Sequence, residues 1–160
     1  MKVELSSQPE NAKVWVYQAE RELGDSAVNQ IYEIGNFFLS QWESHNLPVH
    51  GSIDVLNGRF IVISAHSNED SMCGRAQDSQ MKLIKELEEV IECKLTDRML
   101  VFYEEGTEIK SFHFSELEDL LSQSKITTET IVFNSLVNTK KEFDSNWKSA
   151  LKDTWLKQFV

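Results

Sequence analysis

The dipeptide Asn57-Gly58 lies between two apolar runs, and this pattern constrains the fold more than any other feature of the chain. Ile53 and Val55 precede it, and the run Phe60-Ile61-Val62-Ile63 follows it. Asparagine and glycine tolerate the positive φ that a tight hairpin turn requires. The pattern therefore predicts two antiparallel strands joined by a two-residue turn.

Further strand and helix patterns lie on both sides of this hairpin. Residues 13–17 have the β-branched and aromatic content of a strand, and residues 99–103 and 108–112 flank a glycine-containing loop typical of a second hairpin. Residues 130–133 indicate a short buried strand. Apolar residues recur at helical spacing in two segments, at Val28, Ile31, Gly35, Phe38 and Trp42 and again at Leu83, Ile84, Leu87, Val90, Ile91 and Leu95.

Two capping-box spacings predict further helix starts, one at Ser115 with Glu118 and one at Thr139 with Glu142. In chain order the elements are strand, helix, two strands, helix, two strands, short helix, strand and helix. This order predicts an α+β fold with a ferredoxin-like βαββαβ core, additional strands and a C-terminal helix, built on an antiparallel or mixed sheet. No composition break marks a linker, so residues 1–160 are expected to form a single domain.

The acidic composition narrows the classes of partner. Asp and Glu number 26 against 16 Lys and Arg, which gives a net charge of -10. This charge would repel a nucleic-acid backbone and an anionic membrane surface. The chain has no apolar run long enough to span a membrane, and its first residues lack the apolar core of a signal peptide. Two cysteines, Cys73 and Cys93, suit a reducing compartment, so a cytoplasmic location is expected.

Several stretches of the chain carry a resemblance to known sequences. They are residues 14–18, 59–63, 84–88 and 130–137, Trp42 with His45, and the spacing of Trp147, Trp155 and Phe159. Together these stretches resemble a family of small uncharacterised bacterial proteins of about this length, whose members are often labelled ABC transporter ATPase. The resemblance runs nearly end to end. It implies a fold similar to that of the family, but no defined activity.

The residues do not support the ATPase label. A phosphate-binding loop of that class has glycine, four residues, glycine, lysine and then serine or threonine, because backbone amides and the lysine hold the phosphates. None of the six glycines begins this pattern. Similar sequences have Gly-Cys-Ser-Ile-Asp before the second helix, where this chain has Arg75 in place of the cysteine, and they have histidine where this chain has Leu156. Neither a catalytic residue nor a cofactor is therefore predicted.

The loop at residues 67–78 leads into the second predicted helix and is the first candidate binding site. The free amides of a helix start favour an anion, and Arg75 could hold a phosphate or carboxylate there. Asp78 and Ser79 either contribute to this site or simply cap the helix. Cys73 in the same loop would have a lowered pKa near a helix start, but no histidine close in sequence supplies a base.

Asn134 and Ser135 form a second candidate site, because they follow the predicted strand at 130–133. Polar side chains at such a position either meet a ligand or satisfy the backbone of a turn. His45 and His50 are close in sequence but match no zinc signature, so no metal site is predicted.

Since no catalytic set is recognised, the sequence favours a non-enzymatic cytosolic module that acts through protein contacts. Its partner would be another protein or a second copy, with a homodimer joined by an exposed sheet edge or by the aromatic C-terminal segment. The alternative is a small-molecule binding protein or enzyme for an anionic metabolite, using the 67–78 loop and helix start with Arg75. Asn134 or Ser135 would then orient the ligand.

Overall fold

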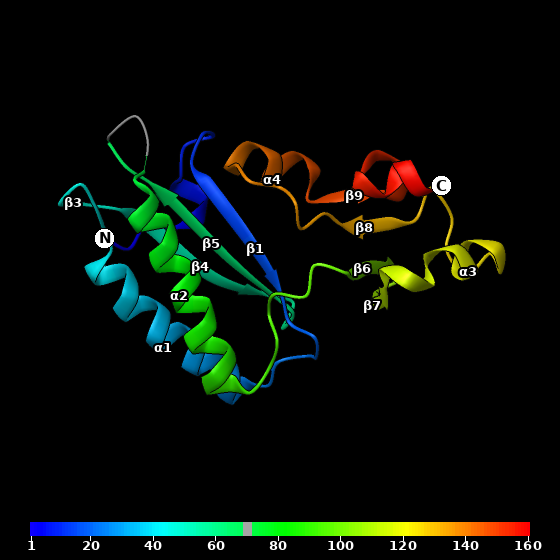
Figure 1. The fold of residues 1–160 in the computed structure, drawn as a ribbon, viewed down its shortest axis with the longest axis horizontal. Helices are drawn as coiled ribbons and strands as arrows, with labels where there is room; N and C mark the ends of the chain where they lie inside the picture. Colours follow the sequence, from blue (N-terminus) through cyan, green and yellow to red (C-terminus); the bar gives the residue numbers. More distant parts are fainter. Residues whose placement is uncertain (69–71) are drawn as a thin grey trace.

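The computed structural model describes residues 1–68 and 72–160 and contains both helices and antiparallel sheets, which confirms the predicted α+β class. The first sheet has the strand order β1–β5–β4. Its strands are β1 (Lys13–Gln18), β4 (His50–Leu56) and β5 (Phe60–His66). Both pairings are antiparallel, as the hairpin pattern predicts (Figure 1).

The predicted hairpin joins β4 to β5. Leu56 pairs with Phe60, so the loop consists of Asn57, Gly58 and Arg59 and is one residue longer than predicted. The φ angles are 56° at Asn57 and 62° at Gly58. Both residues therefore adopt the left-handed conformation for which asparagine and glycine are suited.

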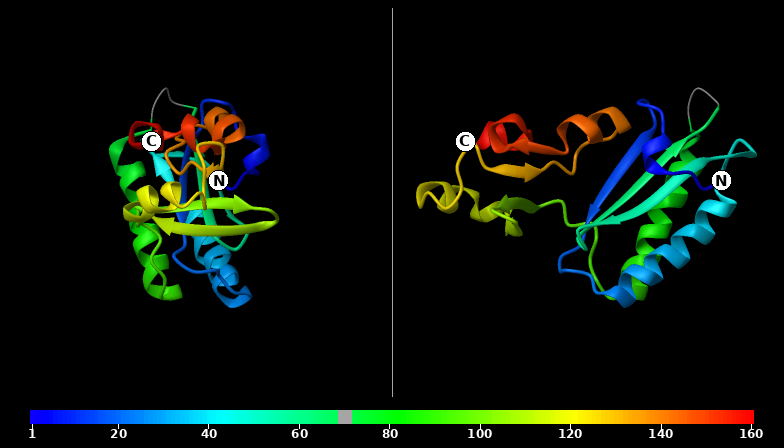
Figure 2. Two further views of the ribbon diagram at one scale, coloured as in Figure 1. Left: turned by 90° about the vertical axis from the view of Figure 1, so that its right-hand side faces the viewer. Right: turned by 180° about the vertical axis from the view of Figure 1, so that it is seen from behind.

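Helices α1 (Asp25–Gln41) and α2 (Gly74–Ile91) cover one face of this sheet, side by side (Figures 1 and 2). The apolar spacing of the sequence matches part of the buried stripes of the two helices, which are formed by Ile31, Gly35 and Leu39 in α1 and by Ala76, Gln80, Leu83, Ile84, Leu87 and Ile91 in α2. Val90 is 39% exposed, and Trp42 and Leu95 lie beyond the ends of the helices. The helix-facing side of the sheet is thus closed by a continuous core.

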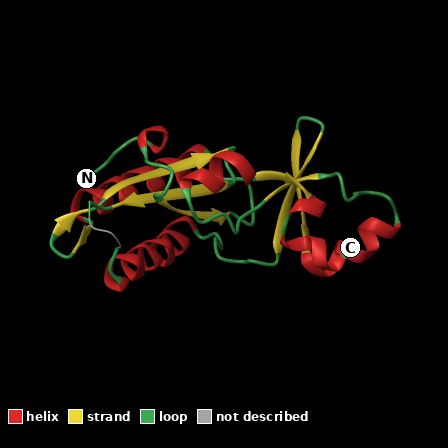
Figure 3. Cartoon of the chain, turned by 90° about the horizontal axis from the view of Figure 1, so that it is seen from above, coloured by secondary structure: helices red, strands yellow, loops and turns green. Residues whose placement is uncertain are grey.

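Strand β6 (Leu100–Glu105) does not join the first sheet. It pairs with β7 (Glu108–His113) and with β8 (Ile131–Phe133), and β8 pairs with β9 (Lys148–Ala150). Figure 3 shows this second antiparallel sheet, of order β7–β6–β8–β9, as a separate group of strands. The predicted ferredoxin-like core is therefore present only as strand, helix, two strands and helix, and β6 does not take the place beside β1.

A cluster of buried aromatic side chains joins the two sheets. Phe60 of β5 is fully buried. Its ring centroid lies 5.3 Å from that of Phe102, 4.6 Å from that of Phe133 and 5.1 Å from that of Trp147. The two sheets thus share one core, while the expectation of a single folding unit stays a prediction.

The predicted capping box at Ser115 and Glu118 is wrong. His113 caps the 3-10 turn Phe114–Glu116 instead: its ring accepts a hydrogen bond from the Ser115 N–H, and the Glu116 carboxylate accepts one from the His113 N–H. Helix α3 (Leu117–Ser122) follows this turn.

Thr139 caps α4 (Lys140–Asn146) as predicted. Its hydroxyl accepts a hydrogen bond from the Glu142 N–H at 3.1 Å. Helix α4 is followed by β9 and by 3-10 turns at Leu151–Asp153 and Trp155–Phe159. Among the described residues, no helix is long and apolar enough to cross a membrane.

The sequence did not predict three short elements near the N-terminal half of the fold. A 3-10 turn lies at Leu5–Ser7. Strands β2 (Glu43–Ser44) and β3 (Leu47–Pro48) form a small hairpin directly after α1. His45, in the turn of that hairpin, has a φ of 52° and lies beyond the end of α1.

Candidate functional site

One edge of β1 is open over most of its length. β1 pairs with β5 from Lys13 to Gln18. On the opposite side, the Val14 N–H donates to the Asn138 carbonyl at 3.1 Å. Because the backbone groups of alternate strand residues point to opposite sides, Val16 and Gln18 point the same way as Val14. A row of backbone donors and acceptors therefore follows this edge.

The chain itself pairs with only the beginning of this edge. Lys13 and Thr139 form an isolated antiparallel bridge. The next rung would require the Asn138 N–H to donate to the Val14 carbonyl. It donates instead to the Glu142 carboxylate, at 3.1 Å. The start of α4 thus ends the ladder and leaves the Val14 carbonyl available.

Near the C-terminal end of β1, residues 94–100 lie beside this edge but do not pair with it as a strand. The Glu20 N–H donates to the Lys94 carbonyl at 3.1 Å, and the Gln18 side chain donates from Nε2 to the Leu100 carbonyl at 2.8 Å. Within residues 1–68 and 72–160, the Val16 amide and carbonyl have no hydrogen-bond partner. The middle of the edge is consequently unpaired.

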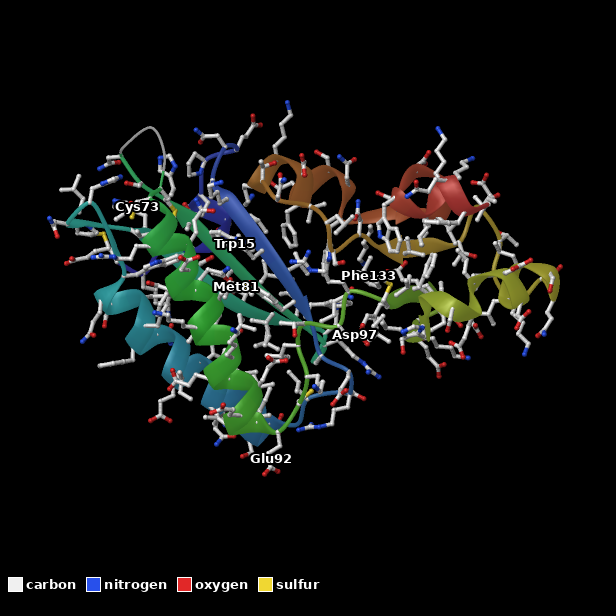
Figure 4. All side chains as sticks on the ribbon, in the orientation of Figure 1. Trp15, Cys73, Met81, Glu92, Asp97 and Phe133 are labelled. Atoms are coloured by element: carbon white, nitrogen blue, oxygen red, sulfur yellow. The ribbon has the colours of Figure 1, made fainter. Side chains whose placement is uncertain are left out.

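These segments and β1 enclose a groove of about 400 Å³. Residues 14–18 form its floor, residues 95–98 and 135–138 form two walls, and Met81 of α2 completes the lining. Figure 4 labels Trp15, Met81 and Asp97 in this part of the molecule. A groove with unpaired backbone groups along its floor can accept an extended segment as an additional strand.

The part of the groove nearer the helices is apolar. Trp15 and Tyr17 are half-buried and pack against the core beneath the helices. The Tyr17 hydroxyl donates to Gln80 Oε1 at 2.8 Å and lies 3.2 Å from the sulfur of Met81, which is 37% exposed. Burial raises the pKa of Tyr17, so its hydroxyl keeps the proton that it donates.

Of the second predicted pair, only Ser135 lies in this groove. The Asn134 side chain accepts a hydrogen bond from the Leu136 N–H at 3.0 Å. Asn134 therefore satisfies the backbone of a turn, which was one of the two interpretations of its position. A ligand role for Ser135 stays a prediction.

The predicted helix start at Asp78 or Ser79 is wrong, because α2 begins at Gly74. Both residues lie within the helix, and the Ser79 hydroxyl donates to the Arg75 carbonyl at 2.9 Å. The apolar spacing missed the first turn because its inward-facing residue is Ala76, which is small but only 1% exposed.

Arg75 and Ser79 line a second groove, of about 500 Å³, between α1 and α2. Lys82 lies on the same lining, and in the part of the chain that the structure describes neither cation forms an ion pair. Phe37 at this groove is 66% exposed. The remaining lining is mostly apolar, with two carboxylates, and consists of Ile34, Phe38, Gln41, Trp42, Glu43, Leu83 and Glu86.

Cys73 is the N-cap residue of α2, and its N–H donates to the Ser44 hydroxyl at 3.0 Å. Hydrogen bonding by the Ser44 side chain lowers the pKa of the Cys73 thiol, and the backbone at Ala76 lowers it further. Nucleophilic catalysis also needs a positioned base, and no histidine ring bonds to this thiol among the described residues. In the same residues, no group of three or more His, Cys, Asp and Glu side chains could hold a metal ion.

Comparison of the chain with protein-family models, with curated proteins and with solved structures finds no match in any of the three. The resemblance to the family labelled ABC transporter ATPase therefore stays an expectation from the sequence. The two grooves are the features from which a function can be proposed.

Sequence reasoning missed Val14, Val16 and Gln18 as site residues. The strand pattern at 13–17 was visible, but side-chain spacing does not tell which strand lies beside another. A ferredoxin-like order places a strand on each side of β1, so the predicted fold left no open edge on this strand. The signal that could have revealed it is the compact hairpin at residues 99–112, since a hairpin with its own third strand can form a separate sheet.

Proposed function

We propose that this protein is a non-enzymatic interaction module that binds an extended segment of a partner protein as an added strand along β1. The observation that supports the proposal is the set of unpaired backbone groups on the floor of a groove, namely the Val14 carbonyl and the Val16 amide and carbonyl. In this mode of recognition, main-chain hydrogen bonds supply affinity and the neighbouring side chains supply specificity.

The groove favours a free segment over a homodimer formed by two β1 edges. β1 is recessed between the walls at residues 95–98 and 135–138. Two copies of β1 would each bring both flanking segments to such an interface, whereas a single extended chain brings none. The partner is therefore an extended segment that stands clear of its own fold.

Val16→Pro should weaken binding of short random peptides selected on the wild-type protein by at least about tenfold. Proline removes the outward N–H of Val16 and blocks the ladder, yet an edge strand tolerates it because no bond to β5 is lost. Fluorescence anisotropy with labelled selected peptides measures the dissociation constants, and circular dichroism establishes that the variant folds.

Ser111→Pro is the control for proline on an edge strand, because Ser111 lies on the outer edge of β7. The Phe114 N–H donates to the Met99 carbonyl at 2.7 Å, so the N–H of Ser111 points away from β6 by the same alternation. This variant should bind the selected peptides as the wild type does.

N-methylation of the peptides adds a test that needs no variant. In a strand, every second amide points toward β1, so methylating those amides should abolish binding, whereas methylating the amides between them should not. Equal effects of the two sets, or equal binding to Val16→Pro, would overturn the proposal.

A second candidate function is binding of a small anion with an apolar body in the groove between α1 and α2. Arg75, Lys82 and Ser79 on an otherwise mostly apolar lining favour this candidate. The cations would hold a carboxylate or phosphate, and Phe37 would cover the apolar part.

A thermal-shift screen with decanoate, hexanoate and inorganic phosphate tests this second candidate. A ligand at about 100 times its dissociation constant stabilises by about 2.7 kcal/mol, which is a rise of several degrees in Tm for a chain of this size. The shift should disappear in Arg75→Ala and persist in Lys85→Ala, since Lys85 lies on α2 outside this groove. A shift that Arg75→Ala retains would place the ligand elsewhere.

A further inference from the structure

A strand added to β1 would present its side chains alternately to two different surroundings. Side chains directly opposite one another on paired strands share a face of the sheet. Partner residues opposite Trp15 and Tyr17 would therefore face α2, and those opposite Val14, Val16 and Gln18 would face the second sheet. Because the period of a strand is two, the two residues facing α2 are separated by one residue, whichever way the segment runs.

The surroundings on the α2 side suit apolar side chains. Trp15 and Tyr17 are half-buried, and Met81 beside them is 37% exposed. The polar tip of Tyr17 is already bonded to Gln80. Two apolar side chains would cover this surface, and sulfur and aromatic rings pack well against them.

The surroundings on the other side leave little space. Val14, Val16 and Gln18 are 1%, 9% and 5% exposed. Val14 and Val16 belong to the cluster that joins the two sheets, and the Gln18 side chain bonds to the Leu100 carbonyl at the start of β6. Val137, from the groove wall, belongs to the same cluster. A partner residue on this side meets a wall that begins at Ser135, so small side chains fit best.

Charge adds a third preference. The charged side chains on the lining of the groove are those of Asp97 and Arg98, which offset each other. The net charge of -10 of the whole chain then sets the sign of the field that an approaching segment meets. A field of this sign speeds the approach of a basic segment and slows that of an acidic one.

We infer that the segment bound at β1 carries apolar side chains at two positions separated by one residue, small side chains around them and basic residues at its ends. This inference rests on the strand addition proposed above and names the chemistry of the partner.

Three synthetic peptides of equal length test the inference. The first has two valines separated by serine, serines beside them and lysines at both ends. The second has the same composition with the valines adjacent, and the third has glutamates in place of the lysines. The first should bind at least about tenfold more tightly than either of the others at low salt, as measured by fluorescence anisotropy. Met81→Glu should weaken the first peptide by a similar factor, while Val90→Glu, an equally exposed position on α2 outside the groove, should not.

The outcomes separate the two proposals. Equal binding of the first two peptides, or equal effects of Met81→Glu and Val90→Glu, would overturn the apolar pattern. Equal binding of the lysine and glutamate peptides would overturn the charge preference. In both cases strand addition still stands if Val16→Pro abolishes binding. Binding of the first peptide that Val16→Pro leaves unchanged would overturn the proposed function itself.

Discussion

Phe60→Ala should lower the free energy of unfolding by about 3–5 kcal/mol, the range for removing a fully buried phenylalanine. Phe60 is 0% exposed and its ring meets those of Phe102, Phe133 and Trp147, so the substitution opens a cavity between the two sheets. Since these contacts join β5 to the second sheet, the loss affects the part of the core that both sheets share. Urea denaturation followed by circular dichroism and by tryptophan fluorescence measures the change.

Phe37→Ala is the control, because Phe37 is 66% exposed and should change the free energy of unfolding by no more than about 0.5 kcal/mol. The wild type should unfold in one transition that both probes report at the same urea concentration. Two separate transitions would show that the sheets unfold independently, and a loss below about 1 kcal/mol in Phe60→Ala would contradict a shared core.

The sequence predicted those parts of the fold that depend on local chemistry. Asn57 and Gly58 adopt positive φ because few other residues do so at low cost, and the strands on either side follow from their apolar character. Thr139 caps α4 because its hydroxyl reaches the amide three residues later. Each of these features is decided by residues within a few positions of one another.

The partner of β6 could not be predicted in the same way. Its pattern resembles that of β1, and both suit a half-buried strand. The second sheet forms because Glu105 and Glu108 close a tight hairpin through Gly106, whose φ is 63°, and because Val132 of β8 pairs with Tyr103 on the other side. The hairpin is local and was predicted, but the pairing of Tyr103 with Val132 joins distant parts of the chain, and strand spacing carries no information about it.

The candidate site exists because β6 pairs with β8 and not with β1. Arg75, Asp78, Ser79, Asn134 and Ser135 were predicted from polar character next to expected helix starts or turns, and the structure brings only Ser135 to the edge of β1. The backbone of Val16 became a candidate because no strand of the chain pairs with it, and the sequence indicated this only indirectly, through the compact hairpin at residues 99–112.

Gly51→Ala should lower the free energy of unfolding by about 1–2 kcal/mol. A Cβ at Gly51 of β4 would lie 2.8 Å from Leu39 Cδ2, 3.1 Å from Trp42 Cε3 and 3.2 Å from the Ser64 carbonyl oxygen. Overpacking of this kind costs about 1–3 kcal/mol, which exceeds the roughly 0.4–1 kcal/mol gained by restricting the unfolded chain. Glycine is thus needed here because α1 and the ring of Trp42 approach the backbone of β4 closely.

Gly74→Ala separates this close approach from the general effect of replacing glycine. A Cβ at Gly74 would meet nothing within 4 Å, and the residue is the first of α2. Alanine favours helix over glycine by up to about 1 kcal/mol, so this variant should be as stable as the wild type or more stable. Thermal and urea unfolding of the two variants side by side gives the comparison. Equal stability of Gly51→Ala and Gly74→Ala would mean that α1 can move away from β4 without loss, and that the packing of Leu39 and Trp42 on this strand does not hold the helix in place.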